Sequence, residues 1–239
     1  MPNNRKKAII IGATSGIGLA LAELLASKNF HLGLSGRRTH LMDGFRGGGH
    51  HITAMDVADT DSSRQTLVEL IKEMGGVDLI VLNAGRGSIR PKIEWENEKR
   101  TIDVNVTGFA ALATVAFEHF QQQGHGHLVG ISSVAAIRGG GGHPAYNASK
   151  AFLSNYLQGL RHDARRSGLP IAITDIKPGF VDTAMAQGDG IFWVASPEKA
   201  ARQIYCAIRR RRKHAYITRR WALIGWLLGW LPDWVVYRK

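Results

Sequence analysis

The feature that most constrains the fold is a series of short apolar segments, each ending in turn residues and followed by a stretch with helical periodicity. Most of these segments are apolar almost throughout, which is typical of strands covered by helices on both faces. The sequence therefore predicts an α/β fold, a single doubly wound Rossmann-type domain with a parallel sheet. The predicted strands are residues 7–12, 31–36, 50–56, 77–85, 127–133, 171–179 and 215–218.

Amphipathic helices are predicted between these strands from apolar residues at helical spacing, as in Ile17, Leu21 and Leu25. The sequence SPEK at 196–199 predicts a helix start, with Ser as the N-cap and Pro at the first helical position. Residues 39–50 favour at best a weak helix and a shortened connection. We assign residues 1–218 to the catalytic domain and 219–239 to a C-terminal tail.

The single cysteine, Cys206, excludes an intramolecular disulfide and any cysteine-based zinc site. We interpret it as an inert buried thiol, because Ile204 and Ile208 lie close by in the sequence. No metal site is predicted. The first residues have no apolar segment before a cleavage site, so we expect a cytoplasmic protein that can lie on the inner face of a membrane.

A glycine-rich turn joins the first predicted strand to the first helix. In IIIGATSGIG, Gly12 permits the tight turn, Gly16 lets the backbone approach a pyrophosphate, and Gly18 allows close helix–strand packing. The helix N-terminus then offers free N–H groups to phosphates. The motif in this context predicts dinucleotide binding.

The end of the second strand bears on the choice of cofactor. An NAD site would place an acidic residue there for the ribose 2′-hydroxyl, whereas this chain has Gly36 followed by Arg37 and Arg38. Because an arginine can bind a 2′-phosphate through charge-assisted hydrogen bonds, we predict NADP(H) rather than NAD(H). The alternative is two solvated arginines at a strand end.

Ser133, Tyr146 and Lys150 follow one another at gaps of thirteen and four residues. Tyr146 and Lys150 share a helix face, so the ammonium group is expected to lower the pKa of the phenol toward neutrality. Ser133, at the carboxyl end of a strand, is placed to bond the substrate oxygen that Tyr146 protonates or deprotonates.

Together these motifs closely resemble the short-chain dehydrogenase/reductase family over about residues 6–217. Further matches are DV at 56–57, NAG at 83–85, DVNVTG around Asn105, YNASK at 146–150 and KPGFVDT at 177–183. One departure is Leu82, where the family usually has asparagine; we expect it to change local sheet hydrogen bonding rather than the chemistry.

The resemblance implies a role for each matching residue. Tyr146 is the acid–base, Lys150 lowers its pKa and binds the nicotinamide ribose, and Ser133 orients the substrate oxygen. Asn105 holds a water in the proton relay, and Thr183 contacts the carboxamide. Ser133 as a strand-end turn residue and Asn105 as a helix-kink residue remain alternatives. The predicted cofactor-binding residues are Gly12, Thr14, Ser15, Gly16, Ile17, Gly18, Arg37, Arg38, Asp56, Val57, Asn83, Ala84, Gly85, Tyr146, Lys150, Pro178, Gly179, Val181 and Thr183.

The tail combines apolar and basic residues. Residues 221–231 are all apolar or glycine, too few to span a bilayer, and residues 199–239 hold eleven Lys and Arg against Asp233 alone, which is ten of the net twelve positive charges. Three partners fit: an anionic membrane surface, a second subunit of a homodimer or homotetramer, and nucleic acid through 209–213. The first is preferred and the last is not expected.

The sequence thus predicts an NADP(H)-dependent oxidoreductase acting on a carbonyl or secondary alcohol. The alternative is a non-catalytic dinucleotide-binding regulatory or scaffold protein. The loop 184–196 follows Thr183, where the resembled family places its substrate lid, and it carries Ile191, Phe192, Trp193 and Val194. We therefore expect a lipophilic substrate.

Overall fold

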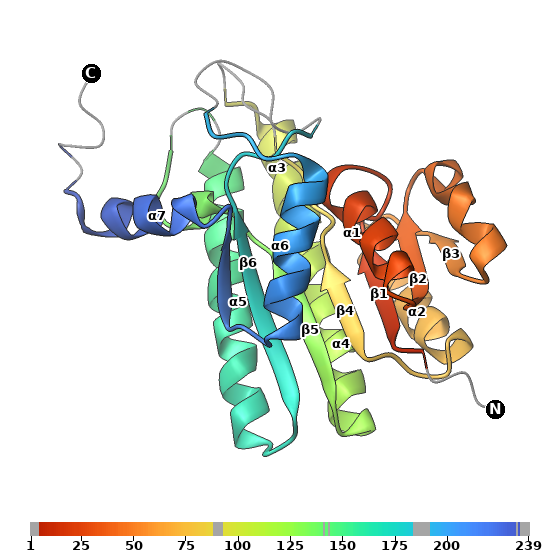
Figure 1. The fold of residues 1–239 in the computed structure, drawn as a ribbon. Helices are drawn as coiled ribbons and strands as arrows, with labels where there is room; N and C mark the ends of the chain where they lie inside the picture. The colour runs from red at the N-terminus through yellow and green to blue at the C-terminus, as the bar shows by residue number, and fades with distance from the viewer. Residues whose placement is uncertain are drawn as a thin grey trace.

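The computed structural model describes residues 5–87, 93–140, 142, 144–183, 192–232 and 234. Within these ranges, one parallel sheet of seven strands has the order β3-β2-β1-β4-β5-β6-β7 (Figure 1). This confirms the predicted doubly wound fold. The strands are β1 (Lys7–Ile11), β2 (His31–Gly36), β3 (His51–Ala54), β4 (Leu79–Leu82), β5 (Gly126–Ile131), β6 (Ile171–Pro178) and β7 (His214–Ile217).

Helices cover both faces of the sheet, as the apolar strands require. On one face, α1 (Gly16–Ser27) and α6 (Pro197–Arg209) pack together over a core that includes Ile10, Leu34 and Ile176. On the other lie α2 (Thr60–Glu73), α4 (Phe109–Gln123) and α5 (Pro144–Arg166). Residues alternate between the two cores along each strand, as the pleat dictates.

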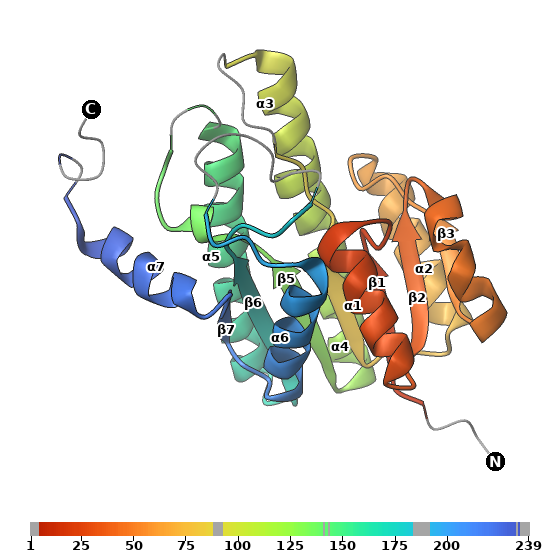
Figure 2. The same ribbon diagram turned by 45° about the horizontal axis from the view of Figure 1, so that its top comes forward.

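Two segments leave the end of the sheet where the strands stop, and α3 stands above it while α7 extends to one side (Figures 1 and 2). The helix α3 (Trp95–Ile102) continues through a π-helical turn, η2 (Asp103–Gly108), into α4. The helix α7 (Arg220–Trp230) follows β7 and projects away from the last strand of the sheet. A short 3₁₀ turn, η3 (Val134–Ala136), follows β5.

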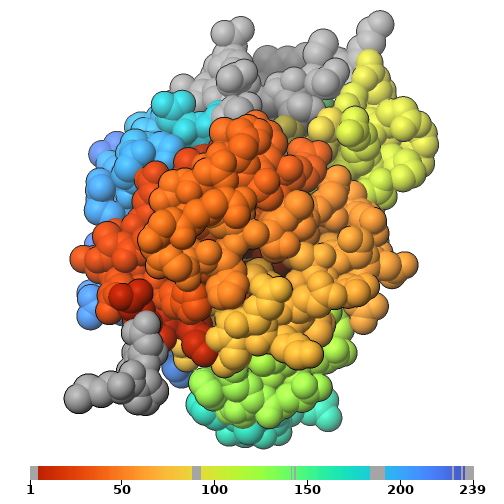
Figure 3. All heavy atoms as spheres, turned by 90° about the vertical axis from the view of Figure 1, so that its right-hand side faces the viewer, coloured from red at the N-terminus to blue at the C-terminus, as the bar shows by residue number. Residues whose placement is uncertain are grey.

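The connection between β2 and β3 is a ten-residue 3₁₀ segment, η1 (Thr39–Gly48), and not a regular crossover helix. Figure 3 views this side of the molecule, where η1 lies over the edge strand. Met42 is the residue of η1 whose side chain is buried. The weak helical pattern of the sequence therefore corresponds to a short, irregular cover. The predicted start of α6 is confirmed: Ser196 caps the helix by accepting a hydrogen bond from Lys199 N, and Pro197 follows it.

The prediction for Cys206 is wrong, because its side chain is exposed. It lies on α6, whose buried residues include Ile204 and Ile208. Two residues along a helix correspond to about 200° of rotation. Cys206 therefore points away from the face that both isoleucines bury.

Candidate active site

The glycine turn is built from contacts that leave no room for side chains. Gly12 has φ +91°, and its N–H donates to Ser35 O at 2.9 Å. A Cβ on Gly12 would lie 2.6 Å from Ala84 N, and one on Gly18 would lie 2.5 Å from Asn83 Nδ2. Asn83 Nδ2 in turn donates to Gly12 O at 2.7 Å. The turn after β1 is thus tied to the segment after β4, where Asn83, Ala84 and Gly85 lie.

The first turn of α1 carries no competing anion. Ser15 is its extended N-cap residue, makes no side-chain capping bond, and no acidic residue follows in the first turn. The N–H groups at the helix start, including those of Gly16, Ile17 and Gly18, face a site suited to phosphate. Arg38 Nη2 donates to Ser15 Oγ at 3.4 Å, so the guanidinium group lies beside this turn.

Gly36, at the end of β2, lies against Thr14: an added Cβ would be 2.6 Å from Thr14 Cγ2. A larger acidic side chain at position 36 would therefore collide with the glycine turn. Arg37 is exposed next to it. After β3, Asp56 is exposed and accepts a hydrogen bond from Ala58 N at 3.1 Å, while Val57 is buried against η2.

Asn105 lies inside the π-helical turn and is buried. Its Oδ1 accepts from Arg86 N at 2.8 Å, while its Nδ2 donates to Arg86 O at 2.8 Å and to Ser149 Oγ at 2.9 Å. Ser149 Oγ donates to Tyr146 O at 2.7 Å. The widened turn thus presents the amide to α5 and to the segment after β4. Asn105 therefore lies at an irregular turn of the helix, as the helix-kink interpretation expects, and also beside α5 and the segment after β4, as the site interpretation expects.

Ser133, Tyr146 and Lys150 meet where β5 ends and α5 begins. The Ser133 hydroxyl lies close enough to the Tyr146 phenol to influence its pKa, and Ser133 Oγ donates to Pro178 O at 3.4 Å and accepts from Ala135 N at 3.1 Å. Lys150 Nζ donates to Ile131 O at 3.0 Å and lies 5.7 Å from the centre of the Tyr146 ring. Ser133 is therefore both a turn residue and a neighbour of the phenol.

The pKa of Tyr146 differs from the expectation. Burial raises it, and the hydrogen bond with Ser133 lowers it by less, so the phenol stays protonated at neutral pH. The Lys150 ammonium donates to a backbone carbonyl, and burial decides the direction in which the pKa of the phenol moves. Burial also lowers the pKa of Lys150, to about 8, although the Asp175 charge opposes the change.

The segment after β6 closes the site from the other side. Gly179 N donates to Ile217 O at 2.5 Å, and Val181 forms a bridge with Ala195. A Cβ on Gly16 would lie 2.8 Å from Thr183 Cγ2, so Thr183 lies over the start of α1. The predicted residues from the glycine turn, η2, β5, α5 and β6 are therefore gathered at one edge of the sheet. Residues 184–191 of the expected lid, Ile191 among them, lie outside the described residues.

A buried polar cluster beneath α5 was missed by the sequence analysis. Asp175, on β6, is fully buried; its Oδ1 accepts from Ser132 Oγ at 2.5 Å and its Oδ2 lies 2.6 Å from Lys177 Nζ. Lys177 Nζ also donates to Ser154 Oγ at 2.5 Å. The available signal was a pair of charged residues inside an otherwise apolar strand, since such residues are buried only when paired.

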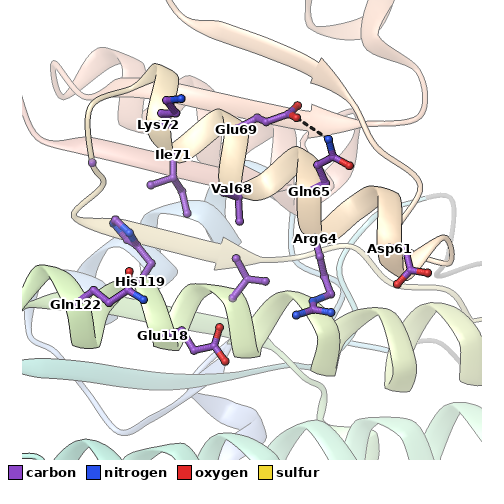
Figure 4. Close-up of a pocket in the computed structure, with 12 residues that line it drawn as sticks. Asp61, Arg64, Gln65, Val68, Glu69, Ile71, Lys72, Glu118, His119 and Gln122 are labelled. Atoms are coloured by element: carbon purple, nitrogen blue, oxygen red, sulfur yellow. Dashed lines mark hydrogen bonds between the residues drawn. The ribbon is translucent and has the colours of Figure 1, made fainter.

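A broad hollow of about 800 Å³ lies between α2 and α4. Figure 4 shows Arg64, Val68, Ile71, Glu118 and His119 around it, with Gln65 bonded to Glu69 at its rim. None of the predicted site residues lines it. It is separate from the site at the strand ends.

Comparison with known proteins agrees with this geometry. The family model described as short chain dehydrogenase matches residues 6–190. The chain belongs to the short-chain dehydrogenase family. An uncharacterised oxidoreductase of Myxococcus xanthus is 38% identical over 188 residues, which cover 75% of this chain and 74% of the relative. One of Mycobacterium tuberculosis is 33% identical over 193 residues, covering 76% and 75%.

Solved structures confirm the fold of this short-chain dehydrogenase. A short-chain dehydrogenase from Streptomyces avermitilis superposes with a TM-score of 0.81 at 23% identity and covers 94% of this chain and 93% of its own. One from Sphingobium yanoikuyae, solved in complex with NADPH, gives a TM-score of 0.79 at 24% identity, with 95% and 97% covered. The predicted family and oxidoreductase class are confirmed.

Proposed function

We propose that this short-chain dehydrogenase is an NADP(H)-dependent enzyme that reduces a carbonyl compound to a secondary alcohol, or catalyses the reverse. The observation that carries the proposal is that Ser133 and Lys150 both lie beside the buried phenol of Tyr146, with Lys150 on the next helical turn. The cluster lies at the sheet edge that also holds the glycine turn. A non-catalytic scaffold protein would have no need of this set.

The glycine turn fits a dinucleotide. A side chain at position 12 or 18 would collide with neighbouring backbone and side-chain atoms, so the turn needs glycine at both positions. The uncapped start of α1 offers N–H groups to a pyrophosphate. Gly36 leaves no room for an acidic ribose partner, while Arg37 and Arg38 follow it. Three structural neighbours, that from Sphingobium yanoikuyae among them, are complexes with NADP or NADPH. These observations support NADP(H) as the cofactor.

When bound, NADP(H) would supply or accept the hydride. The residues of the chain itself carry out the proton transfer. Tyr146, protonated at neutral pH, donates its phenolic proton to the oxygen of the carbonyl group being reduced, and Ser133 donates a hydrogen bond to the same oxygen. Lys150 stabilises the phenolate that results, since an ammonium nearby favours the charged form. Asn105 fixes the start of α5 through Ser149, and the second lone pair of its Oδ1 would bind the water of the proton relay.

Replacing Tyr146 with Phe tests the catalytic role. We expect Tyr146→Phe to lower turnover about 10²- to 10⁴-fold, the usual contribution of a general acid, while NADPH affinity stays within about twofold. The control is Tyr156→Phe, which removes a hydroxyl from the same helix at a position bonded to Thr114. The scaffold alternative predicts that both variants behave alike in every assay.

Replacing the two arginines tests the cofactor assignment. Because a charge-assisted hydrogen bond contributes about 1.5–3 kcal/mol, Arg37→Ala and Arg38→Ala should each weaken NADPH binding about 10- to 100-fold and leave NADH binding almost unchanged. Arg46→Ala is the control, since Arg46 is an exposed arginine paired with Asp43. Equal weakening of both cofactors by Arg37→Ala would contradict binding of the 2′-phosphate.

We propose a lipophilic substrate and a peripheral membrane location. The proposal is supported by the exposed Phe192, Trp193 and Val194 beside the site and by the exposed apolar side chains of α7. No helix among the described residues is long and apolar enough to cross a membrane. A homodimer or homotetramer joined through α7 is the second candidate arrangement, and sizing of the intact protein at several concentrations distinguishes the two.

A further inference from the structure

The helix α7 exposes a wide apolar surface. Leu223, Trp226 and Trp230 are 64, 60 and 79% exposed, and Leu227 is 41% exposed. Exposed apolar side chains gathered on one short helix indicate a contact surface. At its start, Arg219 and Arg220 are exposed, and the sequence has no Asp or Glu between Lys199 and Pro232.

The first turn of α7 is part of the wall beside the active site. Trp221 is 4% exposed and packs directly on Gly179, where its indole ring occupies the position of a side chain. Its ring centre lies 5.5 Å from that of Phe180, 5.2 Å from that of Phe192 and 6.1 Å from that of Trp193. The indole N–H finds no acceptor among the described residues, so packing holds this ring in place.

The exposed residues of the lid continue this surface. Phe192, Trp193 and Val194 are 47–49% exposed, and the Arg220 guanidinium carbon lies 5.8 Å from the centre of the Trp193 ring. Trp193 holds φ +54°, a left-handed conformation unusual for an aromatic residue. Trp221 therefore joins two exposed apolar segments, 192–194 and the outer face of α7, into one surface.

The middle and the end of α7 contact the segment between Ser133 and Tyr146. Gly225 lies against Ile137 and Tyr216, and Arg138 Nη2 donates to Leu231 O at 2.5 Å just beyond the helix. Ile137 and Arg138 belong to the segment between Ser133 and Tyr146. The helix is thus held to both segments that border the site, after β5 and after β6.

We infer that residues 192–194 and α7 form a single docking surface for an anionic lipid bilayer, and that the substrate enters the site from the bilayer across this surface. The inference rests on the proposed reductase function only for the substrate. Arg219 and Arg220 complement anionic headgroups, and exposed Trp residues suit the interface of a bilayer. A second copy of the chain is the poorer occupant, because two such helices would bring arginines together with no acidic residue in the segment to pair with them.

The basic run at 209–213 is not part of this surface. Arg209 ends α6, and β7 runs from His214 to Ile217 before α7 begins. Because β7 is parallel to the other strands, the run lies at the edge of the sheet opposite the active site. At the docking surface, the residues that attract anionic headgroups are therefore Arg219 and Arg220, and not the basic run at 209–213.

The experiment uses the full chain with NADPH and two vesicle types, phosphatidylcholine alone and phosphatidylcholine mixed with phosphatidylglycerol. Lipids brominated on their chains quench only the tryptophans that reach the bilayer. With the mixed vesicles, Trp193→Phe and Trp226→Phe should each lower the quenched fraction of the fluorescence. Trp95→Phe should raise it, because Trp95 is an exposed tryptophan on α3 outside the surface.

The double variant Trp226→Ala/Trp230→Ala should weaken flotation with mixed vesicles at least about tenfold and leave reduction of a soluble ketone unchanged. Quenching that Trp226→Phe lowers and Trp193→Phe does not would overturn the single surface. Absence of quenching together with a concentration-dependent dimer that the double variant abolishes would overturn the membrane assignment in favour of a second copy. Quenching as expected without turnover of any carbonyl would refute the reductase proposal and leave the docking surface standing.

Discussion

The charge state of Lys150 depends on a carboxylate that no sequence motif indicates. Burial lowers the pKa of Lys150 to about 8, and the Asp175 charge is the opposing influence that keeps it from falling further. Asp175 itself is held ionised: burial alone would raise its pKa, but His214 at 3.6 Å, the Lys177 ammonium at 2.6 Å and the hydrogen bond from Ser132 hold it at about 2. We therefore expect Asp175 to act on the site through Lys150, as a positioning residue.

Replacing Asp175 with Asn removes this charge in nearly the same volume. A single opposite charge commonly shifts a pKa by about one unit or more, so the pKa of Lys150 should fall from about 8 to about 7. The fraction of charged lysine at pH 8 would then drop from about one half to about one tenth. The variant also loses the stability linked to the low pKa of Asp175, about 2 kcal/mol above pH 4, which the parent protein loses between about pH 4 and pH 2.

The assay is the pH dependence of kcat/KM for NADPH-dependent reduction of a soluble ketone, with NADPH affinity measured at each pH. The parent enzyme should lose activity above about pH 8, and Asp175→Asn about one unit lower. This limb does not belong to Tyr146, because burial raises the pKa of the phenol above its ordinary value of 10.0.

The matched control is Ser132→Ala, which removes a hydrogen bond to Asp175 but keeps the charge. Its pH profile should coincide with that of the parent enzyme. Two results would refute the reasoning: an unchanged limb in a folded Asp175→Asn protein, or an equal shift in Ser132→Ala.

Three further predictions concern other parts of the chain. Burial holds the pKa of His127 at about 4, so on acidification the unfolded chain binds a proton before the folded chain does. The free energy of unfolding should therefore fall by about 3 kcal/mol as the pH drops from 6.5 to 4. His127→Gln, which can still donate a hydrogen bond to Thr174, should flatten this pH dependence in urea titrations. Cys206 should react with a thiol reagent in the folded protein without loss of NADPH binding, as absorbance of the released thiolate would show. A chain ending at Thr218 should unfold several degrees earlier and lose reductase activity, because it lacks Trp221, whereas Trp226→Ala/Trp230→Ala should melt like the parent protein in calorimetry.

The strands and the glycine turn could be predicted because their physical causes are local. A strand covered on both faces must be apolar nearly throughout, so KAIII and LIVL are recognisable without any knowledge of their neighbours. Gly12 and Gly18 are required by contacts with the segment after β4, but their spacing at a strand–helix junction already indicates the turn. The order of Ser133, Tyr146 and Lys150 likewise places them at one edge, since parallel strands end on the same side.

What the sequence did not show depends on contacts across long separations. Ser132 and Asp175 are 43 residues apart and meet only through the pairing of β5 with β6. The pKa of Tyr146 is set by burial, which the spacing of Tyr146 and Lys150 does not report. The error at Cys206 has a different origin: the isoleucines two positions away were counted as neighbours, although helical periodicity directs them to the opposite side.

The tail shows how one segment can serve two surfaces. Its sequence is apolar all round, so periodicity alone could not say which residues belong to the body of the protein and which remain outside. The structure divides them: Trp221 and Gly225 are buried against the body of the protein, and Leu223, Trp226 and Trp230 are exposed. The inner residues fix the segments after β5 and β6, so they must be retained by any active protein. The outer residues are free to bind whatever the enzyme meets, and for this reason substitution of the outer residues, rather than removal of the tail, separates docking from catalysis.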